Sequence, residues 1–70
     1  ITYITKIRGT DINNIFAITW GGKVFHFNGV RWKLIFRVPA ILNDIQVTDD
    51  LVLIVGSAAV SSFIIKITAV

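Results

Sequence analysis

The chain contains no cysteine, a single histidine and only four acidic residues among its 70 residues. Without cysteine, a disulfide framework and a thiolate zinc site are both excluded, and one histidine cannot form a metal site by itself. The longest stretch without a charged residue, 51–65, is shorter than the roughly 20 residues that a transmembrane helix needs. We therefore expect no metal, no other cofactor and no membrane span.

Charge is scarce and apolar side chains are abundant. Hydrophobic residues make up 54% of the chain and charged residues 16%, against roughly 45–50% and 25% in soluble domains. A chain of this length buries only about 60% of its unfolded surface. Some apolar side chains should therefore be covered by another chain or by a further part of a longer one.

Alternation of apolar and polar residues, with turn residues between the runs, predicts an all-β fold. No segment shows a sustained helical period, and β-branched and aromatic residues dominate throughout. The predicted strands, about seven in number, are approximately Thr2–Arg8, Asn14–Thr19, Lys23–Phe27, Arg31–Phe36, Leu42–Val47, Leu51–Val55 and Phe63–Thr68.

Two turn signals predict an antiparallel meander and its register. Asn28-Gly29 is typical of a two-residue hairpin turn in which Gly29 has a positive φ, and Gly21-Gly22 is a second turn of this kind. Residues equidistant from a turn pair across the strands. The predicted pairs are Phe27–Val30, His26–Arg31, Phe25–Trp32, Val24–Lys33, Ile18–Phe25 and Phe16–Phe27. One face would then carry Phe16, Ile18, Phe25, Phe27, Val30, Trp32 and Leu34, and the other Ile15, Ala17, Thr19, Val24, His26, Arg31 and Lys33.

The two halves of the chain, residues 1–38 and 39–70, resemble each other. Ile7 to Asp11 aligns with Ile45 to Asp49, Ile15 to Ile18 with Val52 to Val55, and Val24 to Phe27 with Ile64 to Ile67. These offsets are 38, 37 and 40 residues by subtraction. A period near 40 residues with four short antiparallel strands is the size of one β-propeller blade.

The run from Arg8 to Trp32 resembles the blade repeat of bacterial, often secreted, β-propellers. In that repeat the pattern G-T-x-x-N-[ND]-[IV]-[FW]-A-V-G is followed by G-x-[IV]-x-H-[FY]-[ND]-G-x-x-W. Thr19 stands where the last glycine of the first pattern is usual, and the second half of the chain lacks the Asn-Gly…Trp ending. The resemblance implies a partial propeller of about one and three-quarter blades, either one domain or part of a larger propeller. It also implies a secreted or cell-surface location in bacteria.

No group of residues has the spacing of a catalytic site. His26 is expected to lie opposite Arg31, which does not suit a general base, and to be partly buried with a hydrogen bond to the backbone or a hydroxyl group of a neighbouring blade. Basic residues alternate with aromatic residues between Asp11 and Asp44, a combination that can bind nucleic acid. The predicted register turns the aromatic rings of Phe25, Trp32 and Phe36 away from Arg31, Lys33 and Arg37, so nucleic acid is not the expected partner.

Two functions remain open at this point. The first is a non-enzymatic interaction or assembly module that works as an oligomer of identical subunits or with the remaining blades of a longer chain. The second is a carbohydrate-binding, lectin-like propeller whose site contains Trp20, His26 and Arg31. Trp20 is expected to protrude beside its glycine turn, whereas Trp32 is expected to be buried in either case.

Overall fold

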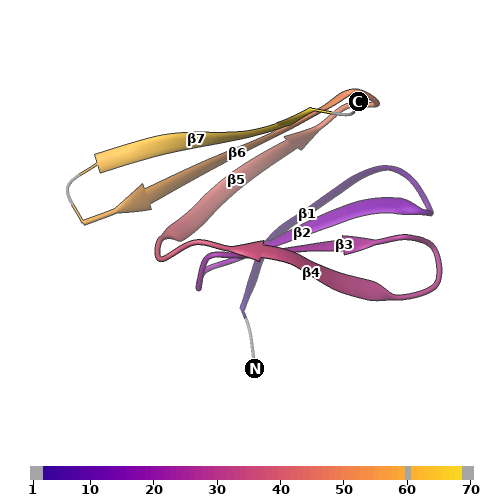
Figure 1. Ribbon diagram of the computed structural model, residues 1–70, viewed down its shortest axis with the longest axis horizontal. Coiled ribbons are helices and arrows are strands. Elements are labelled where there is room, and N and C mark those ends of the chain that lie inside the picture. The colour runs from indigo at the N-terminus through magenta and orange to yellow at the C-terminus, as the bar shows by residue number, and fades with distance from the viewer. Residues whose placement is uncertain (1–2, 60, 69–70) are drawn as a thin grey trace.

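The computed structural model describes residues 3–59 and 61–68, which form seven β-strands and no helix. The predicted all-β class is confirmed, and each predicted strand has a counterpart. The predicted bounds of the second and third strands are confirmed, and those of the other strands differ by one to three residues at one end or both. Thr2, the predicted first residue of the first strand, lies outside the described residues. The strands are β1 (Ile4–Asp11), β2 (Asn14–Thr19), β3 (Lys23–Phe27), β4 (Trp32–Arg37), β5 (Ile41–Val47), β6 (Leu51–Ala58) and β7 (Ser61–Thr68) (Figure 1).

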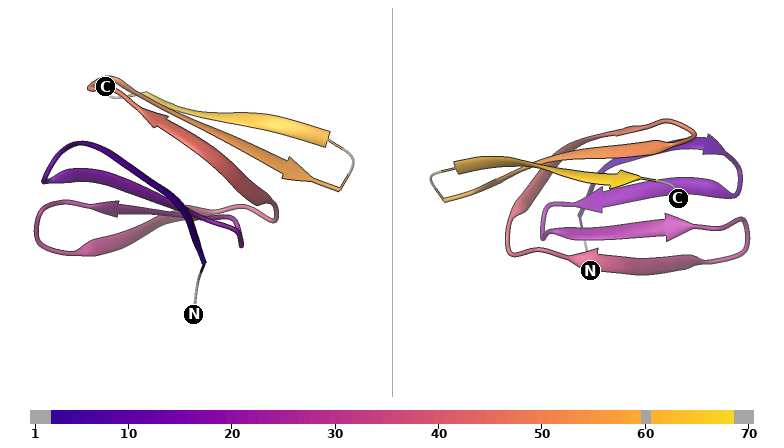
Figure 2. Two further views of the ribbon diagram at one scale, coloured as in Figure 1. Left: turned by 180° about the vertical axis from the view of Figure 1, so that it is seen from behind. Right: turned by 45° about the horizontal axis from the view of Figure 1, so that its top comes forward.

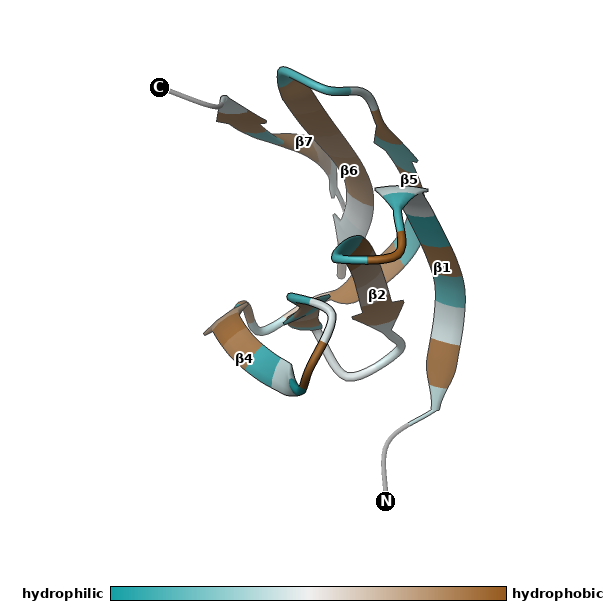
Figure 3. Cartoon of the chain, turned by 90° about the vertical axis from the view of Figure 1, so that its right-hand side faces the viewer, coloured by the Kyte–Doolittle hydropathy of each residue, from teal (hydrophilic) through white to brown (hydrophobic). Residues whose placement is uncertain are grey.

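The strands form two antiparallel meanders. One sheet has the order β1-β2-β3-β4 and the other β5-β6-β7. Residues 38–40 link β4, at one edge of the first sheet, to β5. β5 contacts β1 and β2, which lie at the other edge of the first sheet. The two sheets therefore lie face to face with β1 and β5 close together, while β4 and β7 lie apart (Figures 1 and 3). The second panel of Figure 2 shows the same layers from another side.

The core lies between the two sheets. Ile18 and Val24 of the first sheet and Ile54 of the second are fully buried there. Removing a side chain of this size from water stabilises the fold by about 1.5–3 kcal/mol. The buried apolar cluster consists of Phe16, Ile18, Val24, Leu42, Ile45, Val52 and Ile54, with Phe36, Val38, Val47, Phe63, Ile65 and Ile67 packed around it.

The predicted register between β2 and β3 is wrong by one residue. Ile18 pairs with Val24 rather than with Phe25, because Trp20 joins the two glycines in a three-residue turn. Gly22 occupies the positive-φ position of this turn, at +87°, which is typical of three-residue hairpin loops. An odd shift exchanges the faces of a strand. Phe16 and Ile18 therefore share a face with Val24 and not with the phenylalanines of β3.

The predicted register between β3 and β4 is wrong by two residues. The Oδ1 atom of Asn28 accepts hydrogen bonds from the backbone N–H groups of Val30 (2.9 Å) and Arg31 (3.1 Å), and this holds a four-residue turn. Gly29 has φ of +97°, so its predicted positive φ is confirmed. An even shift keeps the faces unchanged. The observed pairs are Phe25–Leu34, His26–Lys33 and Phe27–Trp32 instead of Phe25–Trp32, His26–Arg31 and Phe27–Val30.

A bulge in β4 corrects a further prediction. Val24 pairs with Phe36, whereas the next residue of β3 pairs with Leu34, so Ile35 is the additional residue. The bulge moves Phe36 to the face that carries Lys33, where it packs against the core. Phe36 and Lys33 therefore do not point to opposite faces, as the regular alternation predicted.

The internal repeat is reproduced in the pairing of the strands. Ile7 pairs with Ala17 and Ala17 with Phe25, and the aligned residues of the second sheet pair in the same way, Ile45 with Ile54 and Ile54 with Ile65. Corresponding faces of the two sheets can therefore be compared residue by residue. We call the face of the first sheet with Phe16, Ile18, Val24 and His26 its front, and the face with Ile7, Ile15, Ala17, Phe25 and Phe27 its back. The aligned front of the second sheet carries Leu53, Val55, Ile64 and Lys66, and the aligned back carries Ile45, Val52, Ile54, Ile65 and Ile67.

Candidate functional site

The back of the first sheet is an apolar surface with no layer over it. A hollow of about 220 Å³ on this surface is lined by Ile4, Ala17, Phe25 and Trp32. Trp32 is 46% exposed, so its predicted burial is wrong for this chain. The indole ring packs against the ring of Phe27 at a centroid distance of 5.2 Å. Strand alternation directs these side chains away from the core between the sheets. Ala17 is 1% exposed because it lies among larger side chains of its own sheet. In the described part of the chain, the second sheet lies over the front of the first sheet and not over its back.

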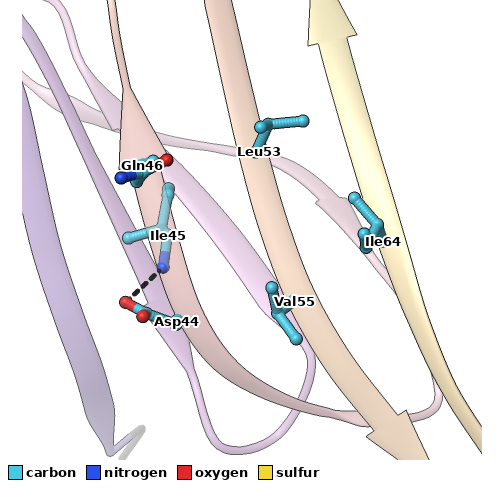
Figure 4. A pocket seen from close by; sticks show the side chains of 6 residues that line it. All are labelled: Asp44, Ile45, Gln46, Leu53, Val55 and Ile64. Atoms are coloured by element: carbon cyan, nitrogen blue, oxygen red, sulfur yellow. Dashed lines mark hydrogen bonds between the residues drawn. The ribbon is translucent and has the colours of Figure 1, made fainter.

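The front of the second sheet is the other uncovered surface. Leu53, Val55 and Ile64 lie on β6 and β7, beside Asp44 and Gln46 of β5 (Figure 4). Together with Ile45 they border a shallow hollow of about 190 Å³. Ile64 is 69% exposed although it is aliphatic. Contiguous apolar surface of this kind, bordered by polar residues, marks interaction sites.

Asp44, at the polar border of this surface, is held in place by a hydrogen bond and an ion pair. The Oδ1 atom of Asp44 accepts a hydrogen bond from the backbone N–H of Ile45 at 2.8 Å and lies 3.4 Å from the Nζ atom of Lys6. The hydrogen bond from Ile45, followed by the interaction with Lys6, lowers the pKa of the Asp44 carboxyl group. Asp44 is therefore anionic at neutral pH and links the edges of the two sheets.

The two uncovered surfaces occupy positions of the repeat that are buried in the other sheet. Val24 on the front of the first sheet is fully buried, whereas its counterpart Ile64 is exposed. On the back the relation is reversed, because Ile45 is 2% exposed and its counterpart Ile7 is 46% exposed. In the described part of the chain, the front of the first sheet packs on the back of the second, whereas the back of the first sheet and the front of the second are uncovered.

Trp20 lies in the β2–β3 turn and protrudes, as predicted. Its side chain is 61% exposed, and its backbone N–H donates a hydrogen bond to the carbonyl oxygen of Tyr3 at 3.1 Å. This bond fixes the turn against the start of the chain and leaves the indole ring free. Trp20 is therefore available for contacts at this end of the first sheet.

His26 lies on the front of the first sheet and is partly buried. Its Nε2 atom is 2.9 Å from Oδ1 of Asn14, and the amide nitrogen of Asn14 donates a hydrogen bond to Oγ1 of Thr10 at 2.8 Å. The imidazole ring also packs against Phe16 at a centroid distance of 4.7 Å. The predicted hydrogen bond of a partly buried histidine exists, but its partner is a side-chain amide within the same sheet. Asn14 is the residue that the sequence reasoning did not single out.

Arg31 ends the β3–β4 turn, at the opposite end of β3 from Trp20. His26 lies between them, with its side chain on the front face. The structure therefore does not bring Trp20, His26 and Arg31 together on one surface. Each of the three residues stays a candidate ligand contact, but they do not form one common site.

A third hollow, of about 150 Å³, lies between the sheets near the β5–β6 turn. The β5–β6 turn is closed by the backbone N–H of Thr48, which donates a hydrogen bond to the carbonyl oxygen of Leu51 at 2.8 Å. The hollow is lined by both polar and apolar residues. Its lining is Asn14, Phe16, Thr48, Asp49, Asp50, Leu51, Val52, Ile67 and Thr68.

Comparisons with known proteins add no assignment. Family models, curated protein sequences and solved structures give no match to this chain. Within residues 3–59 and 61–68, no three histidine, aspartate or glutamate side chains are grouped as metal ligands. The same part of the chain contains no helix long and apolar enough to cross a membrane.

Proposed function

We propose that this chain is a non-enzymatic assembly module whose two uncovered faces pack against further sheets. These sheets come from identical subunits or from the remaining blades of a longer chain. One observation carries the proposal. The exposed apolar positions on the back of the first sheet and on the front of the second are the repeat counterparts of the positions that form the core.

The arrangement of the sheets supports a propeller-like assembly. The first strands of the two sheets, β1 and β5, lie next to each other, and the last strands, β4 and β7, lie apart. Sheets that diverge from a common edge in this way leave the outer face of each sheet open to a further sheet. Radial repetition of short meanders is the principle of a propeller, in which each blade covers the faces of its neighbours.

The absence of cysteine offers a direct test, because a single introduced thiol reports the cover at one position. Leu34→Cys places a thiol on the back of the first sheet, and Ile64→Cys places one on the front of the second. Asp49→Cys, in the exposed β5–β6 turn, is the matched control. In the native particle we expect both face thiols to react with a soluble maleimide at least about tenfold more slowly than the control. Equal rates at the three positions would contradict the proposal.

Carbohydrate binding is the second candidate function, and the exposure of Trp20 favours it. A free indole face beside a turn suits stacking against the apolar face of a sugar ring. The test is a titration with simple monosaccharides, followed by tryptophan fluorescence. We expect a saturable change that Trp20→Phe abolishes and that a substitution of Arg31 does not, because Arg31 lies at the other end of β3. No saturable change with any sugar would remove this candidate.

A further inference from the structure

We infer that a second copy of this chain covers the uncovered faces, and that the copies associate head to tail. The front of the second sheet of one copy packs on the back of the first sheet of the next. This inference rests on the proposed assembly function and names its partner and its geometry. It requires no foreign surface, since each chain supplies both halves of the contact.

The interface already present within the chain is the template for this contact. There the front of the first sheet, with Ile18 and Val24, packs on the back of the second sheet, with Ile45 and Ile54. The cross-strand pairing of each sheet is the same under the repeat alignment, for example Ile18 with Val24 and Val55 with Ile64. The contact between the front of the first sheet and the back of the second therefore shows that two faces with this strand geometry pack together.

The side chains of the two uncovered faces are complementary in size. Within the chain, the aromatic ring of Phe16 on the front meets a back that carries Ile65 and Ile67. In the proposed contact the front carries Leu53 in place of Phe16. The back of the next copy then carries aromatic rings where the template has isoleucine, because Phe25 and Phe27 are the counterparts of those two residues. The aromatic rings are thus on the back in the proposed contact and on the front in the template. Exchanges that conserve the total side-chain volume are compatible with a well-packed layer between two sheets.

The charges at the edge are complementary as well. Lys6 and Asp44 occupy corresponding positions of β1 and β5, and they form the ion pair that links the two sheets within the chain. In the proposed contact Asp44 of one copy comes next to Lys6 of the following copy. The charges are again opposite. Asp44 is 57% exposed by its side chain, so it retains room for this second partner.

A contact between two different faces is heterologous, and it propagates to a closed ring or an open filament rather than to an isolated pair. Contacts of a face with its own copy would instead give closed dimers. The experiment below separates these geometries. Ile64→Lys disrupts only the front of the second sheet, and Ile7→Lys disrupts only the back of the first. Asp49→Lys, in the exposed β5–β6 turn, is the control.

Light scattering on each variant alone and on an equimolar mixture gives the answer. We expect the wild-type chain and Asp49→Lys to assemble alike, and each face variant alone to be monomeric, with association weakened at least about tenfold. In the mixture, the intact back of one variant meets the intact front of the other. We therefore expect a one-to-one dimer in the mixture and no larger species.

Three results would overturn the inference. They are a monomeric wild-type chain, assembly of either face variant alone to the wild-type mass, and a mixture that stays monomeric. Circular dichroism and thermal unfolding establish that each variant is folded, and Ile7→Asn with Ile64→Asn replaces any lysine variant that is not. If the face thiols are protected but the mixture does not dimerise, the assembly function stands and the head-to-tail contact fails.

Discussion

The two sheets follow one alignment of residues and pairings, yet they differ in which face is buried. Ile45 on the back of the second sheet is 2% exposed, whereas Ile7, at the same position of the first sheet, is 46% exposed. Residue type does not explain the difference, because both are isoleucines on the first strand of their sheets. The order of the layers explains it. The second sheet covers the front of the first, and nothing described covers the back.

The comparison also explains the apolar composition of the chain. With only two layers, one face of each sheet contributes to the core, but the alternation supplies apolar side chains to both faces of both sheets. Sheets with two apolar faces are typical of structures in which both faces are covered. The excess of hydrophobic residues therefore belongs to the two faces that are uncovered in the single chain.

The largest expected effect is the difference in the loss of stability between alanine variants of Ile45 and Ile7. Ile45→Ala should reduce the free energy of unfolding by about 3 kcal/mol, within the range for a buried isoleucine, and Ile7→Ala by less than about 1 kcal/mol. Urea unfolding of the dissociated chain measures both. In the assembled particle the two losses should approach each other, because the back of the first sheet is then covered. A loss for Ile7→Ala as large as that for Ile45→Ala in the dissociated chain would contradict the comparison.

The next effect concerns the link between the sheets. Gly22 has a positive φ, and a Cβ atom there would collide with the carbonyl oxygen of Val38 and approach that of Ala40 to 2.7 Å. The backbone N–H of Val38 also donates to the carbonyl oxygen of Gly22 at 2.8 Å. Gly22→Ala should therefore destabilise the fold by about 2–3 kcal/mol, of which about 1–2 kcal/mol is the cost of the left-handed backbone. Thermal unfolding measures the loss.

Gly21→Ala is the control for this prediction, since its Cβ atom would have only Oγ1 of Thr19 within reach, at 4.0 Å. Its effect should stay below about 0.5 kcal/mol, as for surface substitutions in general. Similar losses for Gly21→Ala and Gly22→Ala would mean that the link does not pack as described.

The corresponding turn of the second sheet offers a smaller effect of opposite sign. Ala59 follows β6 with φ of +46°, whereas the first sheet has a glycine with positive φ in its β2–β3 turn. Ala59→Gly should stabilise the protein by up to about 1 kcal/mol, because glycine removes the cost of the left-handed backbone but loses more entropy on folding. The measurement is the midpoint of urea unfolding. A lower midpoint than that of the wild-type protein would refute the strained turn.

The smallest effect concerns the ion pair at the common edge. The folded state lowers the pKa of Asp44, so its stabilising contribution is present above the ordinary carboxyl range near about 4 and is lost as the pH falls through the folded value. Asp44→Asn should therefore unfold at a lower temperature than the wild type at pH 7. The difference should shrink at high salt and disappear in acid. An equal difference at both pH values would exclude a role of the charge.

The sequence predicts the strands well because the turns and the alternation are local signals. Register depends instead on the length of each turn, and both turns here are longer than their glycine-containing dipeptides. Trp20 adds a residue to the glycine turn, and the side chain of Asn28 extends the next turn to four residues. Neither role is visible in the dipeptides Gly21-Gly22 and Asn28-Gly29 alone. The single shift in the first turn was enough to exchange the faces of β2.

The candidate surfaces could have been found in part from the sequence. The repeat alignment already pairs Val24 with Ile64 and Ile7 with Ile45, but it does not say which member of each pair is buried. That depends on how the sheets stack, which only the structure provides. Trp20 was recognised because an aromatic residue beside a glycine turn protrudes. The hydrogen bond between Asn14 and His26 depends on the observed register and could not be read from the sequence.

The proposed assembly requires that both uncovered faces of this chain be covered in the native particle. The most direct test is the mass of the particle formed by the purified 70-residue chain at micromolar concentration, measured by light scattering. We predict a mass that is a multiple, larger than one, of the chain mass of 7.8 kDa. A stable, monodisperse species of a single chain mass would contradict the proposed assembly.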